Sequence, residues 1–476
     1  MARLRFSKVQ QGSYRLQERR SVSQFDVVIL GGGSGGYACA LRASQLGLSV
    51  ALVEENKLGG TCLHRGCIPT KALLHAGEVA DNSRHSSDFG VNTQFIGIDM
   101  LAVNAYKDGV VSKLHKGLQG LVKSRNITYI EGHGRLTSIN EVEVNGVKYS
   151  GKNIVLATGS YPKSLPGLEI DGVQIITSEH AIAMDYLPKS VMVLGGGVIG
   201  CEFASVWKSF GAEVRIIEAL PHLVALEDES SSKQLERAFR KRGIDFELGT
   251  RFKSATNSAD GVSVTLEDGK TFTADILLVA VGRGPVSANL GYEESGLVMD
   301  RGYVLVDDKC RTNVKGIWAV GDLIPTLQLA HVGFAEGILV AEEIAGLNPR
   351  PINYDGVPRV TYSEPEVASV GLTSAQAKER GLDIVELNYD LAGNGKAQIL
   401  KTAGAVKLVS EKNGPVIGIH MVGARVGELL AEAQLIFNWE AEASDVAALI
   451  HAHPTLSEAV GEAHLALAGK PLHSHG

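Results

Sequence analysis

Two cysteines in the N-terminal part of the chain are placed for redox chemistry. Cys62 and Cys67 form a C-x4-C motif within the segment GGTCLHRGCIPTK. Pro69 favours the first turn of a helix, and the dipole at a helix N-terminus stabilises a thiolate, as do nearby cations such as Arg65 or Lys71. The spacing and setting of the pair therefore indicate reversible disulfide exchange.

The spacing alone also allows other roles for this pair. Both cysteines could be buried structural residues, or they could join His64 in a zinc site, although no fourth ligand is nearby. The remaining cysteines, Cys39, Cys201 and Cys310, lie alone in apolar or strand-like segments. We expect these three to be small core residues.

A histidine and a glutamate near the C-terminus could act together as an acid/base pair. In the segment HAHPTLSEAVGEAH, Pro454 places His453 at a turn before a helix, and Glu458 lies about one turn into that helix. A carboxylate that orients an imidazole is the usual arrangement for an acid/base serving a thiol. A surface or interface histidine is the alternative, and the HAH pair has no ordered third ligand for a metal.

Two glycine runs of the form G-x-G-x-x-G predict two dinucleotide sites. Each run follows a short apolar segment and is followed, at the same interval, by a glutamate that could bind a ribose hydroxyl. One run alone could be an ordinary glycine turn, but the matched pair favours nucleotide binding. A carboxylate in the second unit repels the 2′-phosphate of NADP, so we expect NAD there. The two sets are Gly31, Gly33, Gly36 and Glu54, and Gly195, Gly197, Gly200 and Glu218.

The elements that must position these residues follow from the apolar pattern. We expect a strand, a helix and a second strand around each glycine run, a long helix after the cysteine pair, and a strand-rich C-terminal part that ends in helices. The Pro-containing connector NPRPIN predicts a boundary before that C-terminal part. The expected strands are 25–30, 49–54, 154–157, 191–194 and 276–280, and the expected helices are 35–46, 99–124, 427–441 and 444–450.

Length and composition limit the function classes. The 476 residues are enough for several domains, and 46 basic against 53 acidic residues give a net charge of −7, which argues against nucleic acid as the main partner. No apolar run is long enough to span a membrane, and five irregularly spaced cysteines indicate a reducing compartment. The first 24 residues are rich in Arg, Ser and Gln; a mitochondrial transit peptide or a disordered tail fits them.

Taken together, these segments resemble the flavin-dependent pyridine nucleotide–disulfide oxidoreductases, and among them the dihydrolipoamide dehydrogenases. The likeness covers the chain from residue 25 nearly to the C-terminus. It rests on the motifs GGGSGG, GGTCLHRGCIPTK, ATGS, GGGVIGCE, AVGR, GIWAVGDL and HAHPTLSEA. The resemblance implies an α/β fold with two Rossmann-like domains for FAD and NAD and a C-terminal α+β dimerisation domain. The implied parts are a tail (1–24), an FAD domain (25–153), an NAD domain (154–280), a central domain completing the FAD site (281–350) and the dimerisation domain (351–476).

The resemblance also implies a role for each chemical group. Cys67 would be the thiolate beside the flavin and Cys62 the outer thiol that attacks a substrate disulfide, while His453 and Glu458 would come from the other subunit of a homodimer. Electrons would pass from dihydrolipoamide to the cysteine pair, then through FAD to NAD. The cofactor-binding residues implied are Gly31, Gly33, Gly36, Glu54, Thr61, Lys71, Gly134, Thr158, Gly159, Gly195, Gly197, Gly200, Glu202, Glu218, Gly282, Arg283, Asp322, Ala330 and His331, with Lys71 paired to Glu202.

The implied partners are a second copy of the chain and the lipoyl domains and core of 2-oxo acid dehydrogenase complexes, with no nucleic acid and no membrane. The implied location is a bacterial cytoplasm rather than a mitochondrial matrix.

The chain departs from the family at two residues of the redox motif. His64 and Arg65 replace the middle pair of the commoner family sequence CLNVGC, and they could lower the pKa of the outer thiol or narrow the substrate channel. The alternatives are a reductase of a small disulfide such as mycothione or glutathione, although Glu218 disfavours the NADP of a glutathione reductase, and a transhydrogenase or scaffold flavoprotein.

Overall fold

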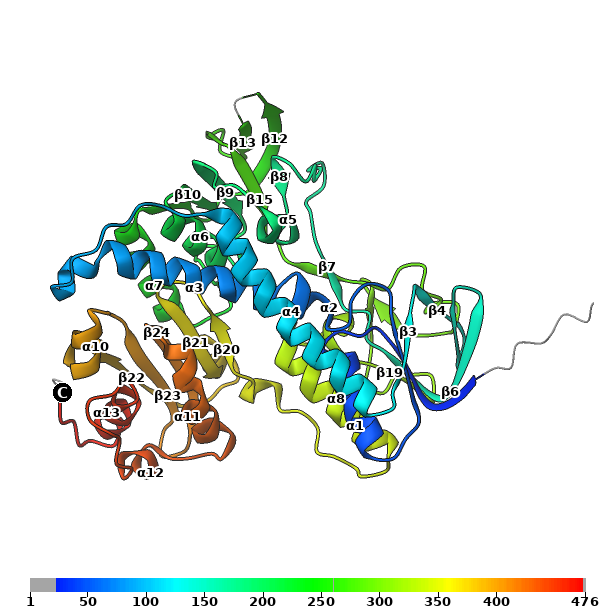
Figure 1. Ribbon diagram of the computed structural model, residues 1–476. Helices are drawn as coiled ribbons and strands as arrows, with labels where there is room; N and C mark the ends of the chain where they lie inside the picture. Colours follow the sequence, from blue (N-terminus) through cyan, green and yellow to red (C-terminus); the bar gives the residue numbers. More distant parts are fainter. Residues whose placement is uncertain (1–22, 260, 474–476) are drawn as a thin grey trace, which may run out of the picture.

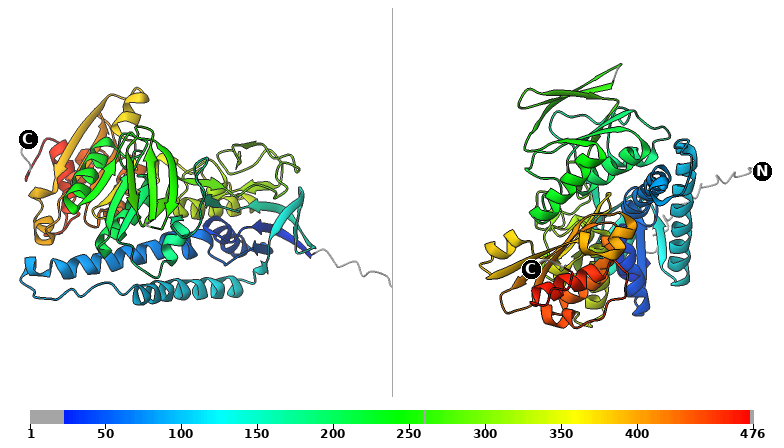
Figure 2. Two further views of the ribbon diagram at one scale, coloured as in Figure 1. Left: turned by 90° about the horizontal axis from the view of Figure 1, so that it is seen from above. Right: turned by 90° about the vertical axis from the view of Figure 1, so that its left-hand side faces the viewer.

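Three larger sheets, each with helices packed against it, dominate the described part of the protein (Figure 1). The computed structural model describes residues 23–259 and 261–473. The N-terminal tail or transit peptide expected at 1–24 therefore lies outside the described residues, apart from Ser23 and Gln24, which begin β1. Two of the sheets are largely or wholly parallel and hold the glycine runs, and the third is antiparallel and C-terminal. Two long helices, α3 (Cys67–Arg84) and α4 (Met100–Ser124), lie side by side along one face of the molecule (Figure 2).

The first sheet is built around strands that contain buried apolar runs, such as residues 27–30 in its first strand. Its order is β3-β2-β1-β6-β5-β4, and β19 also pairs with β6. Helices cover both faces of its parallel part, which is why β2 is buried at every position. Its strands and close helices are β1 (Ser23–Leu30), β2 (Val50–Glu54), β3 (Thr128–Glu131), β4 (Gly134–Ser138), β5 (Glu141–Val144), β6 (Val147–Leu156), β19 (Ile317–Ala319), α1 (Ser34–Gln45), α2 (Gly60–His64) and α8 (Ala330–Ile344).

The second sheet repeats the parallel arrangement in the order β11-β10-β9-β15-β8. A three-stranded antiparallel sheet packs beside it through an apolar cluster that includes Leu194, Val264 and Leu277. Its elements are β8 (Ile175–Ile176), β9 (Ser190–Leu194), β10 (Glu213–Ile217), β11 (Ile244–Glu247), β15 (Ile276–Val279), α5 (Ser178–Ala183), α6 (Val198–Phe210) and α7 (Glu229–Arg242), with β12 (Phe252–Ser258), β13 (Gly261–Leu266) and β14 (Thr271–Ala274) in the smaller sheet.

The C-terminal part forms an antiparallel sheet in the order β20-β21-β24-β23-β22, with helices against it. Strand β24 is buried along its whole length because it lies in the middle of this sheet. The elements are β20 (Arg359–Thr361), β21 (Glu366–Gly371), β22 (Ile384–Asp390), β23 (Ala405–Glu411), β24 (Val416–Gly423), α9 (Ser374–Glu379), α10 (Gly395–Leu400), α11 (Val426–Asn438), α12 (Ala443–Ala447) and α13 (Glu458–Leu467).

The segment between the second and third sheets returns to the first one. Strand β19 runs parallel to β6, and α8 packs against α1. Strand β6 continues through Leu156, so the boundary expected after residue 153 falls inside a strand of the first sheet. Short strand pairs connect these parts; they are β7 (Ser160–Pro162) with β16 (Arg283–Pro285), and β17 (Met299–Asp300) with β18 (Tyr303–Val304).

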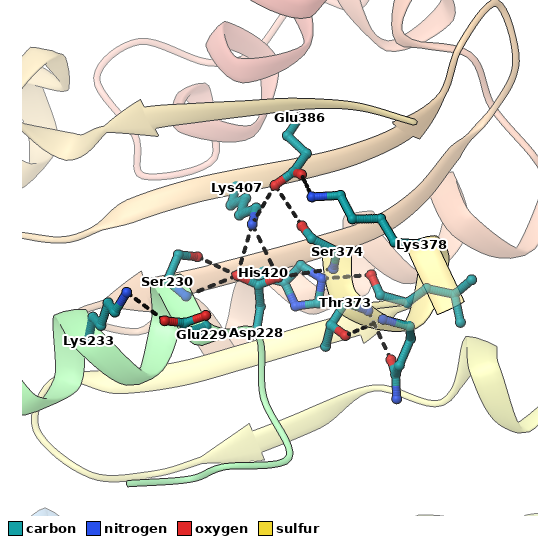
Figure 3. Close-up of polar contacts among 12 residues, drawn as sticks. Asp228, Glu229, Ser230, Lys233, Thr373, Ser374, Lys378, Glu386, Lys407 and His420 are labelled. Atoms are coloured by element: carbon teal, nitrogen blue, oxygen red, sulfur yellow. Dashed lines mark hydrogen bonds and ion pairs between the residues drawn. The ribbon is translucent and has the colours of Figure 1, made fainter. Parts of the chain in front are cut away.

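A buried polar cluster joins the second sheet's helices to the C-terminal sheet (Figure 3). Asp228 is the N-cap of α7, accepting from the backbone N–H of Ser230 at 3.0 Å, and it also accepts from the backbone N–H of Ser374 at 3.1 Å. Lys407 of β23 reaches the same carboxylate at 3.0 Å and Glu386 at 2.9 Å. One carboxylate therefore caps a helix of one domain while it holds two elements of another.

Candidate active site

The two glycine runs adopt the same backbone geometry. Gly31 and Gly195 have φ of +108° and +109°, and a Cβ on either would clash with the backbone oxygen of Ala157 or Ala280 at 2.2 and 2.4 Å. A Cβ on the last glycine of each run would clash as severely. It would lie 1.8 Å (first run) or 1.9 Å (second run) from the carbonyl oxygen of the first glycine. Only glycine fits these positions, because the helix packs directly on the strand.

The middle glycines of both runs face open space instead. A Cβ on Gly33 would meet only an atom 3.9 Å away, and one on Gly197 would meet nothing within 4 Å. These are the positions at which the backbone must let a pyrophosphate approach the helix N-terminus. The residues present therefore fit a dinucleotide at each turn.

The glutamates that follow the two runs are also equivalent. Glu54 accepts from the backbone N–H of Gly32 at 2.7 Å and of Asn56 at 2.8 Å. Glu218 accepts from the backbone N–H of Gly196 at 2.6 Å and of Leu220 at 2.8 Å. Each carboxylate is held at the end of its strand with lone pairs left for ribose hydroxyls.

A cavity of about 560 Å³ opens from the first glycine turn and extends to the first turn of α6. Its walls come from the first sheet, from α2 and α3, from the start of α8 and from the start of α6. It brings together residues that are far apart in the chain, namely Gly31, Gly33, Glu54, Thr61, Cys62, Cys67, Lys71, Gly134, Thr158, Gly159, Glu202, Arg283, Asp322, Ala330 and His331. A dinucleotide with an extended ring system fits a cavity that begins at a phosphate-binding turn and ends beside a thiol pair.

Other predicted residues do not line this cavity. Gly36 is buried in the packing of α1, as Gly200 is in that of α6, while Gly195, Gly197, Glu218 and Gly282 lie at the turns of the second sheet. The second nucleotide turn is thus separate from the first and opens beside it.

Two residues that line the cavity have their polar groups bound elsewhere. The hydroxyl of Thr158 donates to the carbonyl of Val286 at 2.6 Å. His331 contacts the carbonyl of Pro358 at 2.8 Å.

The cysteine pair lies at the N-terminus of α3. Cys67 is the first residue of that helix and Pro69 lies in its first turn, as the sequence predicts. Both cysteines are free thiols in this structure. A hydrogen bond from the Cys62 thiol and the ammonium of Lys71 together outweigh burial and lower the pKa of Cys67 to about 7.

The pKa of Cys62 moves the other way. The hydrogen bond to Cys67, burial and the negative charge on Cys67 raise the pKa of Cys62 far above its usual range. The expectation that His64 or Arg65 lowers the pKa of this outer thiol is therefore wrong. His64 contacts the carbonyl of Leu58 at 2.9 Å, and Arg65 points to Glu179 at 3.4 Å, so neither supplies the thiol with a cation.

Lys71 is held by an ion pair across two domains. Its Nζ donates to both carboxylate oxygens of Glu202, at 2.8 and 2.9 Å, so the pair implied by the resemblance is present. Burial alone would lower the pKa of Lys71, but the Glu202 carboxylate more than offsets this and raises it. Glu202 is only 3% exposed, and a buried carboxylate of this kind depends on its partner.

A second polar group closes the cavity near Asp322. Ser160 donates to Asp322 at 2.5 Å and accepts from Arg283 Nε at 2.7 Å. The backbone N–H of Gly321 donates to the fully buried Glu336 at 2.6 Å. Burial raises the pKa of Glu336 to about 7 despite its three hydrogen bonds. The sequence reasoning missed Ser160 and Glu336, although Ser160 is the last residue of the ATGS motif.

His453 and Glu458 form the expected contact but lie far from the cysteines of the same chain. His453 Nδ1 lies 2.8 Å from Glu458, which begins α13 rather than lying one turn inside it. The backbone N–H of Thr455 donates to the other Glu458 oxygen at 2.6 Å, which fixes the carboxylate. The His453 side chain is 76% exposed, and α13 lies at the far side of the C-terminal domain from α2 (Figure 1). The pair is therefore preorganised by its own hydrogen bonds, on an element that lies away from α2.

The remaining cysteines are buried, as expected of core residues: Cys39, Cys201 and Cys310 are all at most 1% exposed. Within residues 23–259 and 261–473, no three His, Cys, Asp or Glu side chains are arranged to hold a metal ion. The helices in the same ranges include none that is long and apolar enough to cross a membrane.

The chain belongs to the pyridine nucleotide-disulphide oxidoreductases, whose family model matches residues 25–337. The dimerisation domain of that family matches residues 357–464, so the chain carries the element through which these proteins form homodimers. The cofactors of the family, FAD and NAD, are the two that the glycine runs and the resemblance predict.

Several named proteins are similar to this chain over nearly its whole length. A dihydrolipoyl dehydrogenase of Bacillus subtilis is 41% identical, with 95% of this chain and 99% of that protein covered. The mitochondrial dihydrolipoyl dehydrogenase of Pisum sativum is 39% identical, with 97% of this chain and 95% of that protein covered. A leghemoglobin reductase of Vigna unguiculata is 40% identical, with 94% of this chain and 88% of that protein covered. Among solved structures, LpdA of Mycobacterium tuberculosis has a TM-score of 0.87 at 26% identity (94% and 100%). The Cu(II) complex of the HOCl-induced flavoprotein disulfide reductase RclA of Escherichia coli has a TM-score of 0.85 at 26% identity (94% and 100%).

Proposed function

We propose that this chain is a dihydrolipoyl dehydrogenase that oxidises a dihydrolipoyl dithiol and reduces NAD. The observation that carries this proposal is the cysteine pair at the N-terminus of α3, on the wall of the cavity that starts at the first glycine turn. The sequence identity of 41% and 39% to two dihydrolipoyl dehydrogenases over nearly the whole chain supports this proposal.

The opposite pKa shifts of the two thiols assign a different task to each. In the oxidised enzyme Cys62 and Cys67 would be joined as a disulfide. A substrate thiolate attacks Cys62, the Cys62–Cys67 bond breaks, and Cys67 leaves as the thiolate, the form favoured by its lowered pKa. The second substrate sulfur then displaces Cys62, which releases the substrate disulfide and leaves two reduced cysteines. Lys71 stabilises the negative charge on Cys67 throughout.

Proton transfer in this reaction would fall to His453. Its ring contacts Glu458 through Nδ1, so Nε2 is free to take a proton from the attacking dithiol and to return it to the departing Cys62 sulfur. Because His453 is exposed and its partner Glu458 begins α13, which lies well away from α2, it would serve the cysteines of the partner subunit (Figure 1). The homodimer would then be the functional unit.

The two dinucleotides would sit at the two glycine turns. Gly31, Gly33 and Glu54 would hold FAD, and Gly195, Gly197 and Glu218 would hold NAD. FAD bound in the cavity would supply a two-electron carrier between the dithiol and the nicotinamide. Glu218 would select NAD, because its carboxylate repels a 2′-phosphate. The further residues that would contact the cofactors are Thr61, Gly134, Thr158, Gly159, Gly282, Arg283, Asp322, Ala330 and His331. Gly36 and Gly200 would serve the two sites by letting each helix pack closely on its strand.

The proposed partners are the lipoyl domains and the core of a 2-oxo acid dehydrogenase complex, because these carry dihydrolipoyl groups. The proposed location is the bacterial cytoplasm. The relative in Bacillus subtilis supports a bacterial setting.

The test is a comparison of substrates on the purified homodimer. We expect rapid reduction of NAD by dihydrolipoamide, at a kcat/KM at least about a hundredfold above that with NADP, and slow turnover of NADH with oxidised glutathione or mycothione. Preference for one of those disulfides would reject the lipoyl assignment and favour a small-disulfide reductase. NADH oxidation by artificial acceptors without any dithiol activity would instead favour a transhydrogenase.

A further inference from the structure

A tyrosine of the C-terminal domain completes the Lys71–Glu202 ion pair. Tyr362 follows β20, and its ring centroid lies 4.6 Å from Lys71 Nζ. Its backbone N–H donates to Glu202 Oε1 at 3.1 Å. Lys71 comes from α3, Glu202 from α6 and Tyr362 from the segment after β20, so all three domains meet at one ammonium group.

The geometry leaves the ammonium little freedom. Two contacts of Lys71 Nζ are taken by the Glu202 oxygens, and the face of the Tyr362 ring lies on another side of the same group. An aromatic face within about 6 Å attracts a cation through its quadrupole. The hydrogen bond from the backbone N–H of Tyr362 also fixes the Glu202 carboxylate, to which the Lys71 ammonium is bound.

We propose that Tyr362 is a positioning residue, whose ring and backbone N–H hold the Lys71 ammonium beside Cys67. Tyr362 borders the cavity together with Cys67, Lys71 and Glu202, so it acts where the thiol part of the site meets the start of α6. The proposal rests on the proposed function, in which Cys67 is the thiolate of the reduced enzyme.

The charge on Cys67 depends on several neighbours besides Lys71. Cys62 donates to its sulfur, Glu202 opposes its negative charge, and Tyr37 and Arg283 interact with it electrostatically. Tyr37 lies on α1 and burial raises its pKa to about 12, so it stays neutral in the range where Cys67 titrates. Of these groups, Lys71 is the cation that Tyr362 contacts directly, so a change at Tyr362 acts on Cys67 through Lys71.

The test measures the thiolate of Cys67 in variants of Tyr362. The dithiol-reduced holoenzyme is treated with iodoacetamide at pH 5 to 10, and the alkylation rate of Cys67 is followed by mass spectrometry of its peptide. Removing the ring in Tyr362→Leu should raise the apparent pKa of Cys67 by about half a unit to one unit, because the ammonium moves away from the sulfur. Tyr362→Phe keeps the ring and should retain the wild-type profile.

Tyr362→Met provides a second ring-free variant if the leucine variant does not fold. Tyr186→Leu, at a half-exposed tyrosine after α5, is the matched control and should leave the profile unchanged. A ring-free variant with a normal FAD content and a wild-type profile would overturn the inference, as would a shift in Tyr362→Phe equal to that in Tyr362→Leu. If wild-type Cys67 itself shows no thiolate near neutral pH, the proposed function fails instead, so the two failures are distinguishable.

Discussion

At the scale of single residues, the cysteine pair is chemically asymmetric although only four residues separate Cys62 in α2 from Cys67 at the start of α3. Cys67 has a lowered pKa because it accepts a hydrogen bond and faces Lys71, and Cys62 has a raised pKa because it donates that bond. The thiol that is easily ionised is a good leaving group, and the other sulfur is the one left for attack. The exchange steps proposed above rest on this difference between the two thiols.

The first prediction separates the two thiols by mutation. Cys67→Ser should abolish the long-wavelength charge-transfer absorbance between a thiolate and the flavin. Cys62→Ser should keep that absorbance and lose dithiol oxidation. In reduced wild-type enzyme the absorbance should be lost as the pH falls through about 7, since protonation of Cys67 removes the negative charge. The measurement is anaerobic absorbance spectroscopy between pH 5 and 9. Release of FAD from both variants would mean that the cysteines are structural.

The second prediction concerns His453. His453→Gln should slow the dithiol half-reaction by about two to four decades, the range expected for a lost acid/base, while NADH oxidation by artificial acceptors persists. Stopped-flow reduction by dihydrolipoamide measures the first rate. His451, which contacts Glu432 at 2.7 Å in a similar pair, offers the matched control His451→Gln with near wild-type rates. Equal loss of both activities in His453→Gln would assign this residue to folding or dimerisation.

At the scale of elements, α7 shows how one side chain connects two domains. Burial alone would raise the pKa of Asp228, but hydrogen bonds from Ser230, Lys407 and the backbone N–H of Ser374, with the nearby His420, hold it well below its usual range (Figure 3). The adjacent Glu229, whose side chain is 63% exposed, contacts Lys233 and His222. Two neighbouring carboxylates therefore differ greatly in their expected effect on stability.

The third prediction follows from this contrast. Asp228→Asn should lower the free energy of unfolding by about 2 to 4 kcal/mol, because Lys407 loses a buried partner, while Glu229→Gln should change it by less than about 0.5 kcal/mol. A carboxyl with a lowered pKa stabilises the fold above its unfolded pKa near 4, and this stabilisation is lost as the pH falls below that value. Urea unfolding at pH 7 and pH 3 measures both effects. Equal losses in the two variants would contradict the argument.

At the scale of the whole molecule, one chain contains every group of the proposed reaction but does not bring them all together. The cysteines and the acid/base pair belong to separate domains, and α13 lies well away from α2 (Figure 1). Exposed apolar side chains lie close to His453 in the chain: Leu449 is 59% exposed and Ile450 99%. In a protein with this dimerisation domain, such a surface is expected at the interface between subunits.

The fourth prediction tests this at the interface. Ile450→Asp should convert the dimer to monomers, because a buried carboxylate at the interface is costly, and dihydrolipoamide oxidation should fall with the dimer fraction. Analytical ultracentrifugation with parallel assays measures both quantities. Val173→Asp, at a 70% exposed residue of the second domain, is the control and should leave the dimer intact. Monomers with full activity would show that His453 does not act across the interface.

The local elements could be predicted from the sequence because their causes are local. Apolar runs become buried parallel strands, glycine spacing sets the two turns, and Pro69 lies in the first turn of the helix that Cys67 begins. The expected helix at 99–124 is α4, for which Asp99 is the N-cap. The Lys71–Glu202 pair could be predicted only through the resemblance, because its two residues come from different domains.

The sequence by itself therefore determined the element types, the two nucleotide turns and the identity of the thiol pair, since neighbouring residues specify each of them. Only the tertiary structure decided what meets across domains: β19 joins the first sheet, Tyr362 covers Lys71, and α13, which Glu458 begins, lies well away from α2. It also decided the partners of His64 and Arg65, which contact the carbonyl of Leu58 and the carboxylate of Glu179. Such contacts depend on how whole domains pack, and no local pattern of residue types encodes that packing.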